Sequence, residues 1–417
     1  MLKQIEGSHA MAEAIALCRP EVIAAYPITP QTHIIEDLGS MVKSGELEKC
    51  EYINVESEFA AMSASIGASA TGARTYTATS SQGLLFMAEA VYNASGLGLP
   101  IVMTIGNRAI GAPINIWNDH SDSMSMRDAG WIQLFAETNQ EAVDLHIQAF
   151  KLAEELSIPV MVCVDGFILT HAYERVDIPS QEEVDNFLPP FEPQQILDCD
   201  EPVTMGAMVG PEAFMEVKYL AHHKQMVGLR RIGEISEEFE AQFGRNSGGL
   251  VRSYRTEDAD TIVIALGSIN GTIKDTVDEM REQGVKIGVV TIISYRPFPI
   301  KAVREALGGA KRVVVIEKSL AVGMGGMVAS NVRMAMRDFD MQIHTVIAGL
   351  GGRPVLKKSL HRVFDQAVKG ELEFTHFLDL NWDVVNRVLE HGQKVSRPGP
   401  VSATILREMG VNPDTIC

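Results

Sequence analysis

The feature that most constrains the fold is a regular alternation of strand and helix candidates in the first 165 residues. The strand candidates are short runs of apolar and β-branched residues bounded by turn residues, at 21–28, 52–55, 75–79, 101–105 and 159–164. Helix candidates separate them, at 11–18, 57–70, 84–92 and 141–156. Parallel neighbouring strands need such crossover helices. The sequence therefore predicts an α/β domain built on a mostly parallel, doubly wound sheet.

A second, smaller α/β unit is predicted after an irregular connection. The alternation weakens from about residue 167, and prolines at 189, 190 and 193 favour an ordered, extended segment. Residues 234–240 are acidic and helical, which is typical of a solvated helix face. Further strand candidates follow at 261–266, 286–293 and 312–316, with a helix candidate at 272–283. We place the domains at 1–245 and 246–370, and a tail with one helix candidate, 382–389, at 371–417.

Composition excludes several classes of function. The chain has 36 Lys and Arg against 54 Asp and Glu, a formal charge of −18, which argues against a nucleic-acid surface. The longest nearly uncharged stretch, 80–107, contains Gly96, Gly98 and Pro100, so it predicts a buried helix and strand rather than a membrane span. The first residues carry no apolar signal-peptide run, and a cytoplasmic protein is expected.

The five cysteines are too far apart to form a close ligand set. They are Cys18, Cys50, Cys163, Cys199 and Cys417. Zinc and iron–sulfur motifs place cysteines a few residues from one another, and no such pair occurs. Buried, unreactive thiols are expected in the apolar runs around the first and third. Any cluster used for electron transfer is therefore predicted to lie on another chain, and no metal site is predicted on this one.

Two polar residues follow the first two predicted strands. Thr29 precedes Pro30 and could cap the next helix, or its hydroxyl could donate to an anion bound at the carboxyl end of the sheet. Glu58 follows Ser57, a predicted helix cap, so it is either a first-turn acid favoured by the helix dipole or a functional carboxylate. Glu56 is a nearby competitor for that role.

Two more candidates follow the next two strands. The turn 79–83, with sequence Thr-Ser-Ser-Gln-Gly, has exposed amides and a glycine that permits close approach of a ligand. Arg108 follows Gly106 and Asn107, where a guanidinium could grip a carboxylate through two hydrogen bonds. A structural ion pair is the alternative for this arginine.

Two other polar or glycine-rich runs are expected to be structural. Residues 323–326, Gly-Met-Gly-Gly, lack the G-x-G-x-x-G spacing of a dinucleotide turn, so helix–strand packing is expected there. Asp119, His120 and Asp122 lack metal-ligand spacing and are expected to stabilise their loop through hydrogen bonds.

Taken together, four segments resemble the alpha subunit of multi-subunit pyruvate:ferredoxin oxidoreductases, members of the 2-oxoacid:ferredoxin oxidoreductase family. They are Tyr26-Pro27-Ile28-Thr29-Pro30, Glu56-Ser57-Glu58, Thr79-Ser80-Ser81-Gln82-Gly83 and the run from Asn107-Arg108 to Asp119-His120. The resemblance covers nearly the whole chain. It implies a pyrimidine-type thiamine-diphosphate-binding domain followed by a transketolase C-terminal-like domain.

The resemblance also implies roles for individual residues. Glu58 matches the glutamate that hydrogen-bonds N1′ of the thiamine aminopyrimidine and thereby promotes loss of the thiazolium C2 proton. Thr29 and Arg108 match the residues that bind the carboxylate of the 2-oxoacid. Gln82 and Gly83 are expected beside the cofactor. The implied reaction is oxidative decarboxylation of pyruvate with coenzyme A, which gives acetyl-CoA, CO2 and reduced ferredoxin.

The sequence lacks the other half of a thiamine site. Thiamine enzymes hold Mg²⁺ and diphosphate through a Gly-Asp-Gly segment with a downstream Asn, and the nearest run here, Val164-Asp165-Gly166, lacks the first glycine. We therefore expect a beta subunit to supply the diphosphate and Mg²⁺ half. Gamma and ferredoxin-like delta subunits are implied as further partners, with [4Fe-4S] clusters on partner chains and ferredoxin as the acceptor.

Three alternatives stay open at this level. Sister enzymes of the family act on branched-chain 2-oxoacids, 2-oxoglutarate or oxalate. Thr29 disfavours oxalate, and the run 112–117, Ala-Pro-Ile-Asn-Ile-Trp, resembles pyruvate-type subunits most. The chain could instead be a non-catalytic scaffold subunit, although keeping Glu58, Thr29 and Arg108 argues against that. A self-sufficient transketolase-like homodimer would bind thiamine diphosphate and Mg²⁺ without partners.

Overall fold

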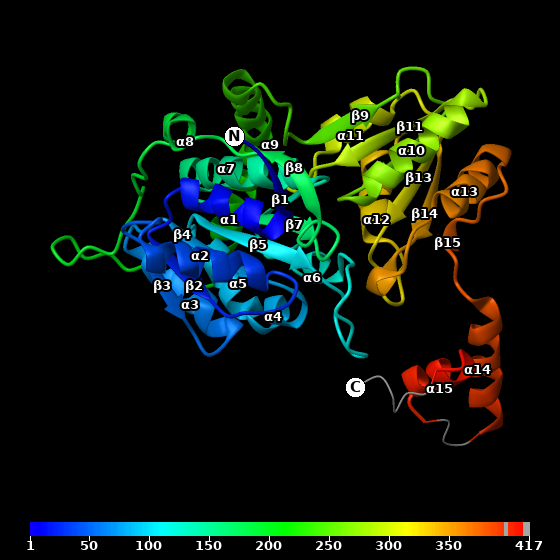
Figure 1. The fold of residues 1–417 in the computed structure, drawn as a ribbon, viewed down its shortest axis with the longest axis horizontal. Coiled ribbons are helices and arrows are strands. Elements are labelled where there is room, and N and C mark those ends of the chain that lie inside the picture. Colours follow the sequence, from blue (N-terminus) through cyan, green and yellow to red (C-terminus); the bar gives the residue numbers. More distant parts are fainter. Residues whose placement is uncertain (396–398, 412–417) are drawn as a thin grey trace.

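The computed structural model describes residues 1–395 and 399–411, so Cys417 lies outside the described residues. Two α/β units lie side by side, with a helical C-terminal segment extending from the second (Figure 1). Both units have the architecture that the strand–helix alternation predicts.

The first unit contains a seven-stranded sheet in the order β12-β6-β7-β5-β4-β2-β3. All neighbouring strands are parallel except β12, which pairs antiparallel with β6. The strands are β2 (Val22–Ala25), β3 (Glu51–Asn54), β4 (Thr75–Thr79), β5 (Ile101–Asn107), β6 (Ile132–Phe135), β7 (Val160–Asp165) and β12 (Ser294–Arg296). Five were predicted. β2 ends three residues earlier than expected, because Tyr26 and Pro27 turn to the surface, and β6 and β12 were missed.

Helices cover both faces of this sheet. α1, α2 and α7 pack together on one face, and α3, α4 and α5 lie on the other (Figure 1). β4, β5 and β7 are therefore buried along their whole length, as expected for central strands covered on both faces. The helices are α1 (Gly7–Leu17), α2 (Thr32–Ser44), α3 (Glu58–Ala70), α4 (Ser81–Phe86), α5 (Ala88–Leu97), α6 (Ser121–Ser125) and α7 (Asn139–Leu156). Ser57 caps α3 as predicted, accepting a hydrogen bond from the Ala60 amide at 3.2 Å.

The connection between the units is more regular than its sequence suggests. β8 (Tyr173–Asp177) pairs antiparallel with the N-terminal strand β1 (Leu2–Glu6). α8 (Gln181–Phe187) follows, and α9 (Phe214–Phe243) is a 30-residue helix. The predicted acidic helix is the last part of α9. Glu237 and Glu240 face solvent, whereas Ile235 and Phe239 are buried against the first unit.

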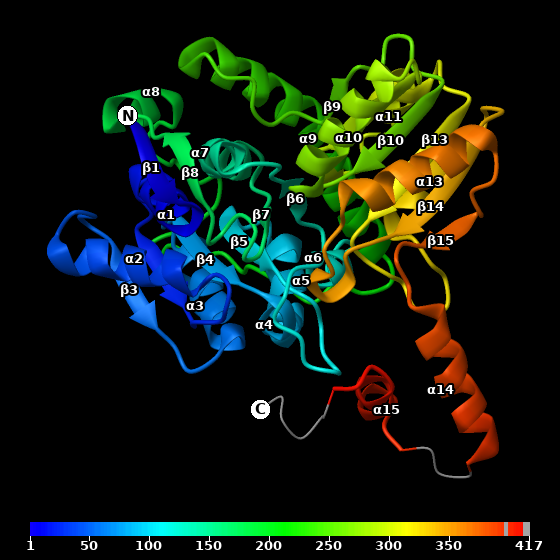
Figure 2. The same cartoon turned by 45° about the vertical axis from the view of Figure 1, so that its right-hand side comes forward.

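The second unit contains a six-stranded sheet in the order β15-β14-β13-β10-β11-β9, in which only β9 is antiparallel. α10 and α13 pack on one face and α11 and α12 on the other (Figure 2). The strands are β9 (Val251–Tyr254), β10 (Thr261–Ala265), β11 (Ile287–Ile292), β13 (Arg312–Glu317), β14 (Gln342–Ile347) and β15 (Thr375–Phe377). The helices are α10 (Ile269–Glu282), α11 (Ile300–Leu307), α12 (Met327–Ala335), η1 (Leu350–Gly352) and α13 (Lys357–Lys369).

The two units share strands and a core. The chain leaves β11 of the second sheet and adds β12 to the edge of the first, where the Phe135 amide donates to the Ile293 carbonyl at 2.8 Å. One apolar cluster includes Trp131 and Phe135 from the first unit and Val303 and Val328 from the second. The relative position of the units is therefore set by buried contacts.

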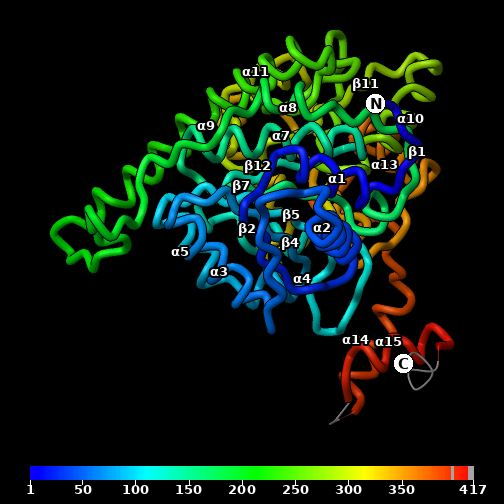
Figure 3. Tube along the Cα trace, turned by 60° about the vertical axis from the view of Figure 1, so that its left-hand side comes forward, coloured from blue at the N-terminus to red at the C-terminus, as the bar shows by residue number. Residues whose placement is uncertain are grey.

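The C-terminal segment projects from the second unit as two helices, α14 (Trp382–Lys394) and α15 (Val401–Glu408) (Figure 3). The first was predicted and is longer than expected, whereas the second was missed. Within 1–395 and 399–411, no helix combines the length and apolar character that crossing a membrane requires.

Candidate functional site

The predicted site residues lie at the carboxyl ends of four adjacent strands. Thr29 follows β2, Glu58 follows β3, Gln82 and Gly83 follow β4, and Arg108 follows β5. β2 is the point at which the strand order reverses, because β3 lies on one side of it and β4 on the other. Ligands of open α/β sheets bind in the crevice at such a switch point.

Arg108 and Thr29 are in direct contact. The guanidinium Nη1 donates to the Thr29 carbonyl at 2.9 Å, and Nε donates to the Asn115 carbonyl at 3.1 Å. Thr29 is exposed, and α2 begins only at Thr32 with Gln31 at the cap position. Thr29 is therefore not the helix cap, and its hydroxyl remains available to a ligand.

Arg108 has no carboxylate partner among the residues that the structure describes, so the alternative of an ion pair is wrong. The residue is only 7% exposed, and its Nη2 makes no hydrogen bond to the described part of the chain. Burial lowers the pKa of Arg108, opposed by the charge of Asp122. A buried cation with free N–H groups is a binding position for an anion, because a carboxylate replaces the hydration it has lost.

Asp122 ties the turns after β4 and β5 together. Its fully buried carboxylate accepts hydrogen bonds from the amides of Ser81 and Arg108, each at 3.0 Å, and from Asn107 Nδ2 and the Ser123 amide, each at 2.8 Å. Burial raises the pKa of Asp122 to about 6 even though these donors lower it. This is the loop-stabilising role expected for the polar run.

Glu58 is the buried member of the Glu56/Glu58 pair. Its side chain is 8% exposed, whereas Glu56 faces solvent. The carboxylate of Glu58 forms no hydrogen bond or ion pair with any described residue. A Cβ on Gly83 would lie 2.6 Å from Glu58 Oε1 and from Thr79 Oγ1. Only glycine at this position therefore lets α4 lie so close to these two side chains.

The surroundings of Glu58 fit a planar polar ring such as an aminopyrimidine. The hydroxyl of Thr79, which with Glu58 flanks Gly83, is buried and lacks a hydrogen-bond partner in the described structure, as does that of Ser80, which lies beside Gly106. Gln82 is half-buried, and its carboxamide accepts a hydrogen bond from Ser81 Oγ and lies against the backbone of Gly111. Unpartnered buried polar groups beside a glycine are typical of a ligand position.

Comparison with known families agrees with this geometry. A family model described as "Pyruvate flavodoxin/ferredoxin oxidoreductase, thiamine diP-bdg" matches residues 13–234, and one described as "Pyruvate:ferredoxin oxidoreductase core domain II" matches residues 259–360. The chain belongs to the pyruvate:ferredoxin oxidoreductase family.

Relatives in this family align with most of the chain. The pyruvate synthase subunit PorA of Methanosarcina barkeri is 46% identical over 390 residues, which are 91% of this chain and 97% of the relative. The subunit of the same name from Thermotoga maritima is 44% identical over 374 residues, 88% of this chain and 95% of the relative. The family resemblance identified from the four sequence segments is thus confirmed.

Two solved structures share the fold. A 2-oxoglutarate:ferredoxin oxidoreductase from Magnetococcus marinus aligns with a TM-score of 0.64 at 19% identity, over 89% of this chain and 65% of that one. A split gene transketolase aligns with a TM-score of 0.53 at 14% identity, over 89% of this chain and 99% of that one. The expected order, a thiamine-diphosphate-binding domain before a transketolase C-terminal-like domain, is confirmed.

In this family member, the second unit holds the loop that orients Arg108. Asn115, whose carbonyl accepts from Arg108, donates through Nδ2 to the Gly351 carbonyl at 3.1 Å. The Gly351 amide donates to Asp119 Oδ2 at 3.0 Å, and a Cβ on Gly352 would lie 2.4 Å from Trp117 Cβ. Sequence reasoning missed this contact, although the glycine-rich run 349–352 was a usable signal.

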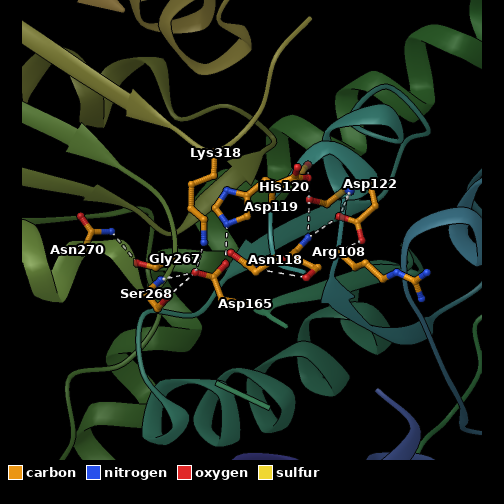
Figure 4. A network of polar contacts seen from close by, with 12 residues as sticks. Arg108, Asn118, Asp119, His120, Asp122, Asp165, Gly267, Ser268, Asn270 and Lys318 are labelled. Carbon is orange, nitrogen blue, oxygen red and sulfur yellow. Dashed lines mark hydrogen bonds and ion pairs between the residues drawn. The ribbon is translucent and has the colours of Figure 1, made fainter. Parts of the chain in front are cut away.

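Asp165 is the centre of a buried network between the units (Figure 4). Its carboxylate lies 2.6 Å from His120 Nε2 and 3.2 Å from Lys318 Nζ, and it accepts from the Ser268 amide at 3.1 Å and from the Ser268 hydroxyl. Burial alone would raise its pKa, but the charges of Lys318 and His120 hold the pKa of Asp165 well below its usual range. Both oxygens of this carboxylate are bound by these partners.

The glycine-rich turn at 323–326 packs helix α12 on strand β13, as predicted. The amides of Met327, Val328 and Ala329 all donate to the Glu317 carboxylate, at 2.8–3.1 Å. A Cβ on Gly326 would lie 2.1 Å from Glu317 Oε1. The chain's own carboxylate thus occupies the helix N-terminus that a phosphate would need.

Proposed function

We propose that this chain is the alpha subunit of a pyruvate:ferredoxin oxidoreductase and supplies the pyrimidine- and substrate-binding half of its thiamine diphosphate site. The reaction converts pyruvate and coenzyme A to acetyl-CoA and CO2 with reduction of ferredoxin. The observation that carries this proposal is the buried guanidinium of Arg108, which lacks a carboxylate partner and lies at the same sheet edge as the unpartnered carboxylate of Glu58.

Arg108 and Thr29 bind the carboxylate of pyruvate in this proposal. The contacts of Nη1 with Thr29 and of Nε with Asn115 fix the plane of the guanidinium before substrate arrives. Nη2 and the Thr29 hydroxyl then donate to the two carboxylate oxygens. Because the Arg108 guanidinium is already desolvated and oriented, little conformational entropy is lost when pyruvate binds.

Glu58 hydrogen-bonds N1′ of the aminopyrimidine, with Gln82 and Gly83 beside the ring. Thiamine diphosphate, when bound, supplies the electron sink that decarboxylation of a 2-oxoacid requires. To donate to N1′, Glu58 has to hold a proton.

Partner subunits complete the site in this proposal. A beta subunit holds Mg²⁺ and the diphosphate, gamma and ferredoxin-like delta subunits complete the complex, [4Fe-4S] clusters lie on partner chains, and the assembly is cytoplasmic. Three large apolar side chains near the sheet edge are exposed in this chain alone: Phe86 is 61% exposed, Ile114 79% and Trp117 52%. Their exposure supports a partner subunit that covers this surface. We retain 1–245, 246–370 and 371–417 as the proposed domain limits.

The test is Glu58→Gln in the assembled complex, assayed by pyruvate-dependent reduction of ferredoxin. Since general acid–base contributions are typically 10²–10⁴-fold, we expect kcat to fall by about 10²-fold or more, with little change in KM for pyruvate. Glu56→Gln is the matched control, because Glu56 is exposed two residues away, and it should keep its activity. Unchanged turnover in Glu58→Gln would support a scaffold role instead.

A branched-chain 2-oxoacid is the second candidate substrate. A ketoisovalerate oxidoreductase subunit VorA from Pyrococcus abyssi is 40% identical over 354 residues, 84% of this chain. Arg108 contacts the carboxylate that all 2-oxoacids share, so it does not select a side chain. Turnover of the complex with a panel of 2-oxoacids decides between them, and faster turnover with 2-oxoisovalerate than with pyruvate would overturn our choice.

A further inference from the structure

Three potential metal ligands converge outside the residues assigned to thiamine and substrate. Glu6, His33 and His171 each offer a ligand atom, and these atoms all lie within 4.8 Å of one another. We propose that these three side chains form a binding site for a divalent transition-metal ion, with Zn²⁺ the best match. The sequence did not indicate this site, because its ligands are 27 and 138 positions apart. The proposal does not depend on the proposed activity.

The backbone holds two of the three ligands in place. Glu6 ends β1, and His171 lies two residues before β8, the antiparallel partner of β1. The Gly7 amide donates to the Ala172 carbonyl at 3.0 Å, and the Ser8 amide donates to the Thr170 carbonyl at 2.9 Å. These bonds fasten the start of α1 to the segment that carries His171. The site is therefore preformed on this side.

The third ligand comes from α2. His33 lies in its first turn, with Nδ1 2.7 Å from Glu6 Oε1, and the centroids of the His33 and His171 rings are 4.9 Å apart. A tetrahedral zinc ion with bonds of about 2.0–2.1 Å places its ligand atoms about 3.3 Å from one another. The three ligand atoms lie within 4.8 Å of one another, so a zinc ion would have to draw them somewhat closer together. Two imidazoles with one carboxylate are a common zinc ligand set.

Other contacts orient the ligands as metal sites require. His171 Nδ1 lies 2.7 Å from Thr170 Oγ1, which also accepts a hydrogen bond from the Phe167 amide at 2.8 Å. If Nδ1 carries the proton, the lone pair of Nε2 points away from Thr170 and is free for the metal.

His9 and Asp37 lie next to the Glu6 carboxylate. His9 Nε2 lies 3.8 Å from Glu6 Oε2, and His9 Nδ1 contacts the Asp37 carboxylate. Glu6 is 8% exposed, whereas the His33 side chain is 43% exposed. An ion can therefore enter from the His33 side, and a water molecule can complete the coordination. A zinc ion here would link β1, α2 and the segment before β8.

The test measures zinc bound to the assembled complex. Wild-type complex is incubated with Zn²⁺, desalted and analysed by mass spectrometry for metal content, alongside a His33→Ala/His171→Ala variant. The matched control is His222→Ala/His223→Ala, which removes two exposed imidazoles from α9. We expect wild type and control to retain one more zinc ion per chain than the His33/His171 variant. Equal zinc in all three would overturn the proposal.

A milder variant and a spectroscopic signature guard against misfolding and against zinc bound at cluster cysteines. Glu6→Gln keeps the shape of the side chain, and we expect at least tenfold weaker Zn²⁺ affinity by calorimetry, with an unchanged melting temperature in chelator. Unchanged affinity would contradict the assignment. X-ray absorption at the zinc edge should show two imidazoles and one carboxylate oxygen, and a sulfur-ligated ion would overturn it.

Discussion

Replacing Gly83 with alanine is expected to displace the Glu58 carboxylate, because the added methyl group has no room. Its carbon would lie 2.6 Å from Glu58 Oε1 and from Thr79 Oγ1, whereas ordinary contacts of a Cβ begin at 3.4 Å. Both oxygens must therefore end about 0.8 Å farther from the added carbon. Thr79 is β-branched and fully buried in β4, so it can yield little, and the longer Glu58 side chain takes up most of the displacement.

The expected effect follows from this displacement. A misplacement of about 1 Å in an active site can cost about 10²-fold in rate, which corresponds to about 2.7 kcal/mol. We therefore expect kcat for pyruvate-dependent ferredoxin reduction by the assembled complex to fall by about 10²-fold in Gly83→Ala. Crowding should also lower the free energy of unfolding by about 1–3 kcal/mol.

Gly96→Ala is the matched control. Gly96 lies in α5, where an added Cβ meets no atom within 4 Å, so this variant should keep its activity and gain about 0.5–1 kcal/mol in stability. Activity of Gly83→Ala within twofold of Gly96→Ala, in a folded complex, would refute the position we give to Glu58.

Three further variants test other parts of the structure. Arg108→Lys keeps the charge but loses the planar fork, so KM for pyruvate in steady-state assays should rise about tenfold or more. Lys318→Met leaves Asp165 buried with one cation fewer, which should lower the free energy of unfolding by about 3–5 kcal/mol in denaturant titrations. Burial lowers the pKa of His146 to about 4, so the free energy of unfolding is unaffected by this group above pH 6.5 and falls as the pH drops from 6.5 to 4, where only the unfolded chain binds the proton. The loss amounts to about 3 kcal/mol, and His146→Gln should show a shallower loss of unfolding free energy over that range.

Each of these three predictions would be contradicted by a specific result. Lys357→Met breaks an exposed ion pair with Glu279 and should cost less than about 1 kcal/mol, so equal losses in the two lysine variants would exclude the role given to Lys318. An unchanged KM in Arg108→Lys would exclude a two-point grip on the carboxylate. Identical pH dependence with and without His146 would show that other groups dominate acid unfolding.

The sequence by itself determined the architecture of both units and the family. Local periodicity reports whether a segment is buried on one face or on both, so strands such as 75–79 and the Ser57 cap of α3 were predicted to the residue. The position of a residue directly after a parallel strand then places it at the carboxyl edge of the sheet. For this reason Thr29, Glu58, Gln82, Gly83 and Arg108 could be named in advance as neighbours.

Only the tertiary structure decided which of the alternatives each residue takes. Glu56 and Glu58 differ in burial because α3 turns one of them toward the glycine of α4, and Thr29 is free because α2 starts three residues after it. The contact of Asn115 with Gly351 joins groups 236 positions apart. Such contacts depend on how the two sheets pack against each other, and a short-range pattern such as the glycine-rich run 349–352 does not say which segment it will meet.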